Sequence, residues 1–199
     1  MSTTVSITIN YLQMPSESQF RPSTRQVAEF EIRRVLIPSP EYSRFLYASV
    51  GAKWKWYERL VWTREEWLAW LNRPGQETWV GYVKGTPIGF FELLHQTNGS
   101  IEIAYFGLMP DFIGRGLGGI LLTAAVRRAW DAGAQRVWLH TCTLDHEHAL
   151  NNYLARGFQL FKVEQKDVVI PNLEPADLFA GTKATLPVHS TQAQEAPDV

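Results

Sequence analysis

Hydrophobic and polar residues alternate in several short stretches of this chain, and a period of two is typical of half-buried β-strands. The first stretch, residues 4–12, places Val5, Ile7, Ile9 and Tyr11 on one side. Similar alternation, or a short apolar run, predicts further strands at residues 30–37, 78–83, 87–95, 101–108, 136–142, 158–163 and 167–170.

The connections between three of these strands are short. Lys84-Gly85-Thr86 joins the strands at 78–83 and 87–95, and Thr97-Asn98-Gly99-Ser100 joins the second of these to residues 101–108. Links of this length, one of them containing Asn-Gly, favour antiparallel hairpins. The middle of the chain is therefore expected to form an antiparallel sheet.

Helix starts are also recognisable. Ser39-Pro40-Glu41 supplies an N-cap, a proline at the first helical position and an acidic first turn. That helix is expected to run irregularly toward Trp62, with a break near Gly51. Residues 63–66 have the form of a capping box, which opens a short helix that ends before Arg73.

Two later helices are predicted at residues 119–132 and 147–156, where apolar residues recur with helical spacing and a glycine follows each end. Helices that follow antiparallel strands indicate a mixed α/β (α+β) fold. The length of 199 residues and the 45% hydrophobic content suit one globular domain, over residues 26–170. Residues 1–25 are expected to be an N-terminal extension with an extra strand, and the composition of 171–199 predicts a disordered tail.

Charge excludes several classes of protein. The formal net charge is −1 and the two signs are interspersed, so neither a nucleic-acid partner nor a membrane surface is expected. The first residues lack the features of a secretory signal and no run is long enough for a membrane span, so a cytoplasmic location is expected. A single cysteine, Cys142, cannot form an internal disulfide or a multi-cysteine zinc site.

The glycine-rich run at residues 114–119, G-R-G-L-G-G, matches the dinucleotide template G-x-G-x-x-G. That template belongs to a parallel βαβ unit with an acidic residue about 20 positions later. Here the run follows antiparallel strands, and the nearest acid, Asp145, comes too late. No Lys-Ser/Thr follows, which excludes a Walker loop. What remains is a loop whose backbone N–H groups, at a helix start, suit a phosphate.

Two motifs carry a family resemblance. Residues 109–122, entered from an antiparallel strand, resemble the acyl-CoA pyrophosphate loop of the GNAT superfamily of N-acetyltransferases, Gln/Arg-x-x-Gly-x-Gly/Ala. Residues 149–158, A-L-N-N-Y-L-A-R-G-F, resemble its A-x-x-x-Y-x-x-x-G-F signature. The likeness spans residues 30–163. Two departures are Ile113 at the Gln/Arg position and Asp145-His146 where many members carry Asn near the last helix.

The resemblance implies a mostly antiparallel sheet splayed around an acyl-CoA site and flanked by helices. It also implies transfer of an acetyl group from acetyl-CoA to a primary amine of a small molecule or peptide, in a ternary complex without a metal, and it allows a homodimer. The rival class is a non-catalytic acyl-CoA-binding sensor. The cofactor contacts that the resemblance implies are Phe106, Leu108, Met109, Gly114, Arg115, Gly116, Leu117, Gly118, Gly119 and Asn152.

Attack on a thioester needs a neutral amine, and an alkyl amine has a pKa of about 10.4. The resemblance places Glu102, in the strand before the loop, beside the thioester, so Glu102 is the leading base; Glu92 or a water chain is the alternative. Tyr153 occupies the position of the family's general acid, although packing in the core would also explain it. Cys142 with His140 offers a ping-pong alternative.

The acceptor region is expected among the aromatic residues before the hairpin strands. Eight tryptophans are present, and an aromatic wall suits an apolar, aromatic or cationic amine. Lys53, Lys55 and Arg59 offer instead a site for an acceptor carboxylate. Trp67 and Trp70 sit at helical spacing and are expected in the core, so only two or three aromatic residues should touch the acceptor.

Overall fold

The computed structural model describes residues 2–171, so all but the first residue of the predicted tail lies outside the described residues. One seven-stranded sheet runs through the molecule in the order β2-β3-β4-β5-β6-β1-β7, antiparallel at every pair except β5–β6. Its elements are β1 (Ser2–Met14), β2 (Phe30–Arg34), α1 (Pro40–Gly51), α2 (Arg64–Leu71), β3 (Gln76–Val83), β4 (Thr86–His95), β5 (Ser100–Leu108), α3 (Gly118–Asp131), β6 (Arg136–Cys142), α4 (Ala149–Ala155) and β7 (Gln159–Pro171).

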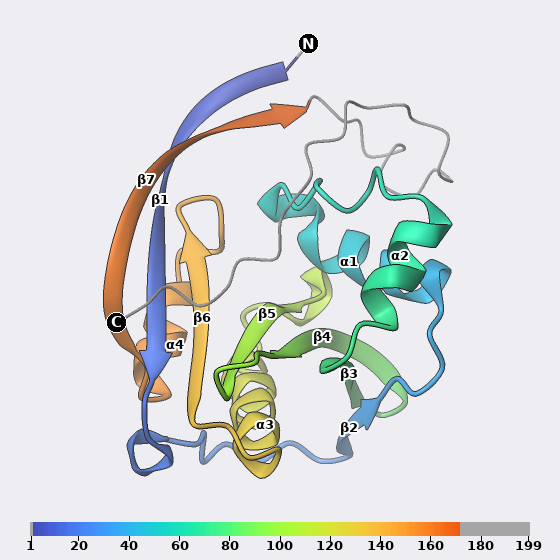
Figure 1. The fold of residues 1–199 in the computed structure, drawn as a ribbon. Coiled ribbons are helices and arrows are strands. Elements are labelled where there is room, and N and C mark those ends of the chain that lie inside the picture. The colour runs from blue at the N-terminus through green and yellow to red at the C-terminus, as the bar shows by residue number, and fades with distance from the viewer. Residues whose placement is uncertain (1, 172–199) are drawn as a thin grey trace.

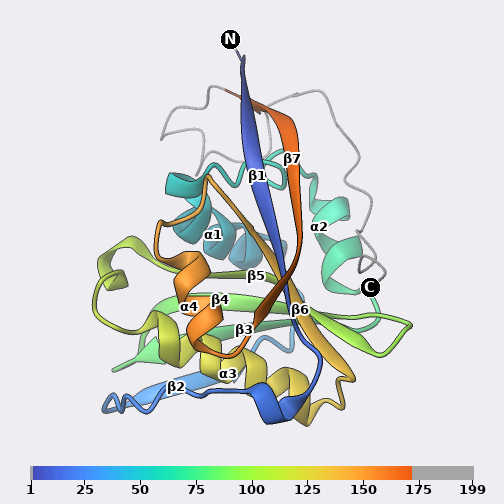
Figure 2. The same ribbon diagram turned by 90° about the vertical axis from the view of Figure 1, so that its left-hand side faces the viewer.

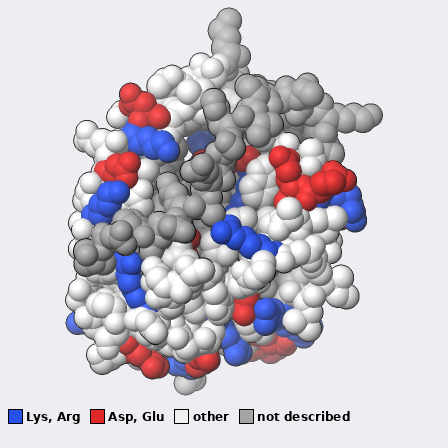
Figure 3. Space-filling view, in the orientation of Figure 1, with Lys and Arg blue, Asp and Glu red and all other residues white. Residues whose placement is uncertain are grey.

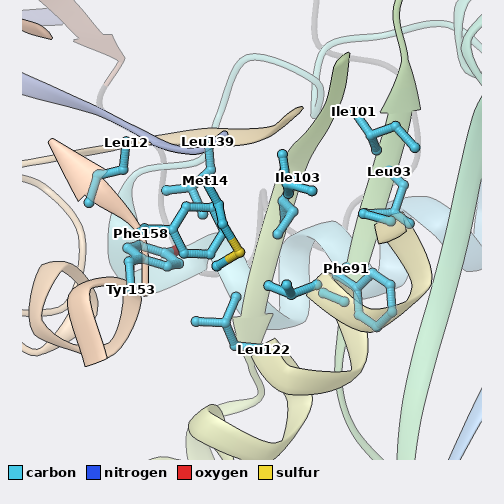
Figure 4. Close-up of a cluster of buried hydrophobic side chains, with 14 of the residues drawn as sticks. Leu12, Met14, Phe91, Leu93, Ile101, Ile103, Leu122, Leu139, Tyr153 and Phe158 are labelled. Carbon is cyan, nitrogen blue, oxygen red and sulfur yellow. The ribbon is translucent and has the colours of Figure 1, made fainter. Parts of the chain in front are cut away.

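Helices cover both faces of this sheet. The helices α1 and α2 pack on one face, over β3, β4 and β5, while α3 and α4 lie on the other (Figures 1 and 2). The predicted mixed α/β fold with a mostly antiparallel sheet is confirmed. The larger core lies under α3, whose Leu121, Leu122 and Val126 pack against β-strand residues such as Met14 and Phe91 (Figure 4).

Some predicted boundaries are confirmed and others are wrong. The first helix ends at Gly51, at the predicted break, but beyond the short 3₁₀ turn at Ala52–Trp54 the chain is irregular rather than helical toward Trp62. The last helix begins at Ala149 rather than at Glu147. Before it, the Asp145 carboxylate accepts hydrogen bonds from the Thr141 hydroxyl and from the backbone N–H of Cys142. The strand predicted at 30–37 ends at Arg34.

The two strands predicted at the end of the domain are one strand, β7. It pairs with β1 from Ser2↔Pro171 to Gln13↔Gln159. The polar residues 164–167, which interrupt the hydrophobic pattern, stay in the strand because the backbone of β1 pairs with them. The ladder bonds are made by the backbone, so a polar stretch can continue a strand that has a partner.

The sheet opens between β5 and β6. These parallel strands pair at only three positions, Ser100↔Arg136, Ile101↔Val137 and Glu102↔Trp138, and then diverge (Figure 1). On its other edge β5 carries a bulge, because Glu92 faces Tyr105 while its neighbour Leu93 faces Ile103. A bulge increases the local twist of a strand, and here it accompanies the divergence.

Candidate active site

The glycine-rich loop connects β5 to α3 at the open end of the split. Gly114 and Gly116 have φ angles of +78° and +72°, which favour glycine. The helix begins at Gly118, and its N-cap residue, Leu117, makes no side-chain hydrogen bond to the first turn. By contrast, α2 begins with the capping box predicted from the sequence. The first N–H groups of α3 therefore have no side-chain cap, and with the helix dipole they form a site suited to an anion.

The helix α4 supplies a polar side chain to this loop. A Cβ added at Gly118 would lie 3.6 Å from Asn152 Nδ2, and one added at Gly119 would lie 3.7 Å from Asn152 Oδ1. The structure thus brings Asn152, named from the sequence as a cofactor contact, beside the start of α3. Arg115 lies at the exposed rim, with its guanidinium 5.6 Å from the ring centroid of Phe112.

The remaining expected contacts lie on the last part of β5. Phe106 and Leu108 pack on the α3 side of the sheet, whereas Met109 packs on the α1 side. The N–H of Met109 donates to the carbonyl of Ile88 at 2.8 Å, so this donor is already used. Among the described residues, the β5 edge that faces β6 has no strand partner beyond Glu102. The backbone groups along this edge therefore make no ladder hydrogen bonds to another described strand.

Two arginines near the loop were missed from the sequence. A Cβ added at Gly116 would lie 2.5 Å from Arg25 Nη1, and one added at Gly119 would lie 2.9 Å from Arg156 Nη1. Arg156 stands within the second motif, which offered a hint. Arg25 lies in a polar stretch that the sequence marks only as a linker, so no local pattern pointed to it.

Glu102 is buried at the point where the sheet splits. Its neighbours Ile101 and Ile103 pack in the core with α3, so the Glu102 carboxylate points to the face of α1 and α2. Burial raises the pKa of Glu102 to about 8, against the opposing effect of the positive charges of Arg59 and Arg73. His140 Nδ1 on β6 lies 3.9 Å from Glu102 Oε1, and the His140 side chain is 38% exposed.

Glu92, the alternative base, is engaged by other side chains. Its Oε2 accepts a hydrogen bond from Arg59 Nη1 at 2.8 Å and another from Trp70 Nε1 at 3.0 Å. The Arg59 guanidinium lies 3.9 Å from the ring centroid of Trp70 and 4.0 Å from that of Tyr105. Both charged side chains are buried. The idea that Arg59 is free to hold an acceptor carboxylate is therefore wrong, because Glu92 pairs with it.

Tyr153 lies on the opposite face of the sheet from Glu102. Its ring packs edge-on against Phe106, with 6.0 Å between the ring centroids. It packs in the same way against Phe158 at 6.3 Å, and Figure 4 shows these two rings side by side. Burial, together with the charge of Asp145, raises the pKa of Tyr153, so its phenol stays protonated and can donate. Tyr153 and Glu102 thus lie on opposite faces of the sheet, and the core position that the sequence allowed for Tyr153 is confirmed.

The other reactive residues do not form a second centre. Burial raises the pKa of the Cys142 thiol, which disfavours the thiolate that a ping-pong mechanism needs. Residues 2–171 contain no group of three or more His, Cys, Asp and Glu side chains placed to hold a metal ion.

No helix in residues 2–171 has the length and apolar character to cross a membrane. Acidic and basic side chains are interspersed on the face shown in Figure 3.

The tryptophans fall into groups with different surroundings. Trp67 is buried in the core under α1 and α2, as predicted, and Trp62 and Trp70 surround Arg59. Trp79 stacks on Phe91 on the α3 side. Trp54 is also partly buried, and it differs from these groups because its ring lies 5.3 Å from that of His146.

The fold and the site define a class of protein. A split α/β sheet with an uncapped helix start beside a glycine loop is an arrangement for a phosphate-bearing ligand that reaches into the split. The sequence model of the acetyltransferase (GNAT) family matches residues 39–158. The chain therefore belongs to the GNAT acetyltransferase family. No curated protein matches it in a sequence search.

Solved structures agree with this fold. A GCN5-related N-acetyltransferase from Kribbella flavida is 18% identical with a TM-score of 0.59, over 88% of this chain and 62% of the other. A functionally unknown protein from Staphylococcus epidermidis is 18% identical with a TM-score of 0.57, over 85% and 64%. A Bacillus subtilis acetyltransferase solved in complex with CoA is 17% identical with a TM-score of 0.50, over 65% and 76%. The chain thus spans less than two thirds of the length of the first two.

Proposed function

We propose that this protein is an N-acetyltransferase that moves an acetyl group from acetyl-CoA to a primary amine of a small molecule or peptide by direct attack. The observation that carries this proposal is the position of Glu102. It is a buried carboxylate at the last paired position before β5 and β6 diverge, and among residues 2–171 it has no arginine partner like that of Glu92. Family membership supports acyl-CoA as the donor.

In this proposal Glu102 takes the proton that the amine must lose. The amine nitrogen bonds to the thioester carbonyl carbon, its proton passes to the Glu102 carboxylate, and the carbon–sulfur bond then breaks. Tyr153 donates its phenolic proton to the departing thiolate. A pKa of about 8 makes Glu102 a stronger base than an exposed carboxylate while leaving part of it ionised near neutral pH.

The same burial that raises the pKa of Glu102 also separates it from water, so its proton needs a path out. His140 supports such a path, because its Nδ1 lies 3.9 Å from Glu102 Oε1 and part of its side chain is exposed. We therefore assign His140 a relay role between Glu102 and solvent. A sensor that only binds acyl-CoA would need neither Glu102 nor this relay.

The testing experiment measures thiol release from acetyl-CoA with a panel of amines, amino acids, polyamines and peptides, for the parent, Glu102→Gln and Tyr153→Phe. We expect turnover of at least one amine, and each substitution should lower kcat about 100-fold, the usual scale of acid–base catalysis. The Glu102→Gln profile should recover in part as the pH rises, because more of the free amine is then neutral.

CoA affinity, measured by calorimetry, is the control. It should stay within about twofold of the parent in both variants, since neither group contacts the phosphates in this proposal. Failure of every amine, together with intact CoA binding, would favour the sensor. Unchanged kcat in Tyr153→Phe would remove Tyr153 as the acid, and a pH profile identical to that of the parent would remove Glu102 as the base.

A further inference from the structure

The segment between β1 and β2, residues 15–29, passes beside the first half of α3 and the end of α4 (Figures 1 and 2). Two hydrogen bonds fix its course. The N–H of Arg21 donates to the carbonyl of Arg156 at 3.0 Å, and the N–H of Ser23 donates to Thr123 Oγ1 on α3 at 2.8 Å. The segment is thus attached to both helices that border the glycine-rich loop.

The close contact at Gly157 shows how tightly this segment is held. A Cβ added there would clash with the carbonyl oxygen of Gln19, and the φ angle of Gly157 is +99°. Glycine at this motif position therefore lets the segment lie against α4. The side chain of Phe20 packs against the main core beside it. The course of residues 19–25 is consequently determined by the fold.

This course brings Arg25 to the loop. The Arg25 guanidinium borders Gly116, with Nη1 2.5 Å from the position that a Cβ added there would take. The backbone N–H of Arg25 donates to Ser23 Oγ at 3.3 Å. On the α4 side, Arg156 Nη1 lies 2.9 Å from the position that a Cβ added at Gly119 would take. The Nε of Arg156 is buried and has no hydrogen-bond partner among residues 2–171.

The loop itself is poor in positive charge. The position that carries Gln or Arg in the family's motif is Ile113, and Arg115 is the loop's only cation, with Asp111 as a carboxylate close by in sequence. Arg25 and Arg156 bring two guanidinium groups to the glycines that precede and begin α3. Guanidinium groups bind phosphate oxygens in a bidentate, charge-assisted way.

We infer that Arg25 and Arg156 bind the phosphate groups of the acyl-CoA, and that residues 19–25 form a cationic strap which replaces the side chain missing at Ile113. The inference rests on the proposed use of acyl-CoA but not on Glu102, Tyr153 or the acceptor. The phosphates concerned are the diphosphate or the 3′-phosphate of CoA, and both offer the same chemistry to a guanidinium.

Calorimetry on the full chain tests this inference with CoA, dephospho-CoA and pantetheine, for the parent, Arg25→Gln, Arg156→Gln and the control Arg127→Gln. Arg127 is an exposed arginine about two turns further along α3. Each of the first two changes should weaken CoA binding about tenfold and reduce its dependence on salt, as loss of a charge-assisted contact predicts. Arg127→Gln should leave the affinity unchanged.

The ligand series identifies the phosphate. An effect of Arg25→Gln that is lost with dephospho-CoA assigns Arg25 to the 3′-phosphate, and one that persists assigns it to the diphosphate; pantetheine should bind parent and variants equally. CoA affinity within twofold of the parent in both variants, or tighter binding in Arg25→Gln, would overturn the inference. Arg25 is exposed, so its substitution should not affect folding, and melting curves check this.

Binding separates this inference from the proposed function. If the parent binds CoA, the variants bind it weakly and no amine is acetylated, the strap stands and the enzymatic proposal fails. If amines are acetylated while the arginine variants bind CoA normally, the enzyme stands and the strap fails. A parent that does not bind CoA would overturn both.

Discussion

Two buried carboxylates lie on the same face of neighbouring strands, yet they have opposite surroundings. Glu92 on β4 accepts hydrogen bonds from Arg59 and Trp70, in a cage of aromatic rings. Glu102 on β5 has His140 at 3.9 Å as its nearest ion-pairing side chain among those described. Around Glu92, the Arg59 guanidinium compensates the negative charge of the carboxylate. Around Glu102, burial leaves the carboxyl with a raised pKa.

The difference shows how burial alone fails to identify a catalytic group. Both side chains are almost completely removed from water. A carboxylate that is paired with a buried arginine has its charge and lone pairs satisfied, so it acts structurally. An unpaired one can change its protonation state in the working range of pH, which is what a general base requires.

The largest effect that tests this comparison is expected from Glu92→Gln. The change leaves the Arg59 charge buried without a counter-ion, so we expect it to lower the free energy of unfolding by about 3–5 kcal/mol. Urea unfolding followed by circular dichroism measures it. The control is Glu31→Gln, which breaks the exposed pair with Arg33 and should leave the unfolding midpoint in place. A loss below about 1 kcal/mol for Glu92→Gln would show that the cage does not depend on the ion pair.

The next effect concerns Glu102→Gln, and it depends on pH. In the folded parent the carboxyl has a pKa of about 8, above the value near 4.5 in the unfolded chain. Between these values the folded state holds one proton more, so the parent loses stability as the pH rises, by up to about 1.4 kcal/mol per pH unit. The variant carries no such proton and should escape this loss.

Thermal melts at pH 5 and pH 8.5 check this expectation. The two proteins should melt alike at pH 5, where Glu102 is neutral in the fold, and the variant should melt at the higher temperature at pH 8.5. Glu65→Gln, at an exposed carboxylate on α2, should follow the parent at both values. An equal difference between parent and Glu102→Gln at both pH values would mean that Glu102 does not titrate in this range.

The smallest effect should come from Trp70→Phe, which keeps an aromatic ring over Arg59 but removes one of the two donors to Glu92. We expect a loss of about 1 kcal/mol in the free energy of unfolding, the usual value for one hydrogen bond. Trp54→Phe, which removes a partly exposed indole, is the matched control. If Trp70→Phe were as costly as Glu92→Gln, the indole with its hydrogen bond, rather than the ion pair, would hold this region together.

Much of the local structure could be predicted from the sequence. The capping box at Thr63, the serine cap at Ser39 and the hairpin turn at Asn98-Gly99 depend on neighbouring residues, and the structure contains all three. The first helix ends at Gly51, where the sequence predicted a break, but the continuity of β7 could not be predicted in the same way. Tertiary pairing decides whether a polar stretch such as residues 164–167 stays in a strand.

The sequence by itself determined the mixed fold and the glycine loop before α3, because motifs and hydrophobic periodicity are local properties, whereas Glu102 and Tyr153 were named as groups to test through the resemblance to the GNAT superfamily. Only the tertiary structure decided that Arg59 neutralises Glu92, that the sheet opens just after Glu102, and that Arg25 reaches Gly116 across 91 positions of the chain. These depend on contacts between segments that are distant in sequence, and such contacts set which charges are paired, which are buried alone and which face a ligand.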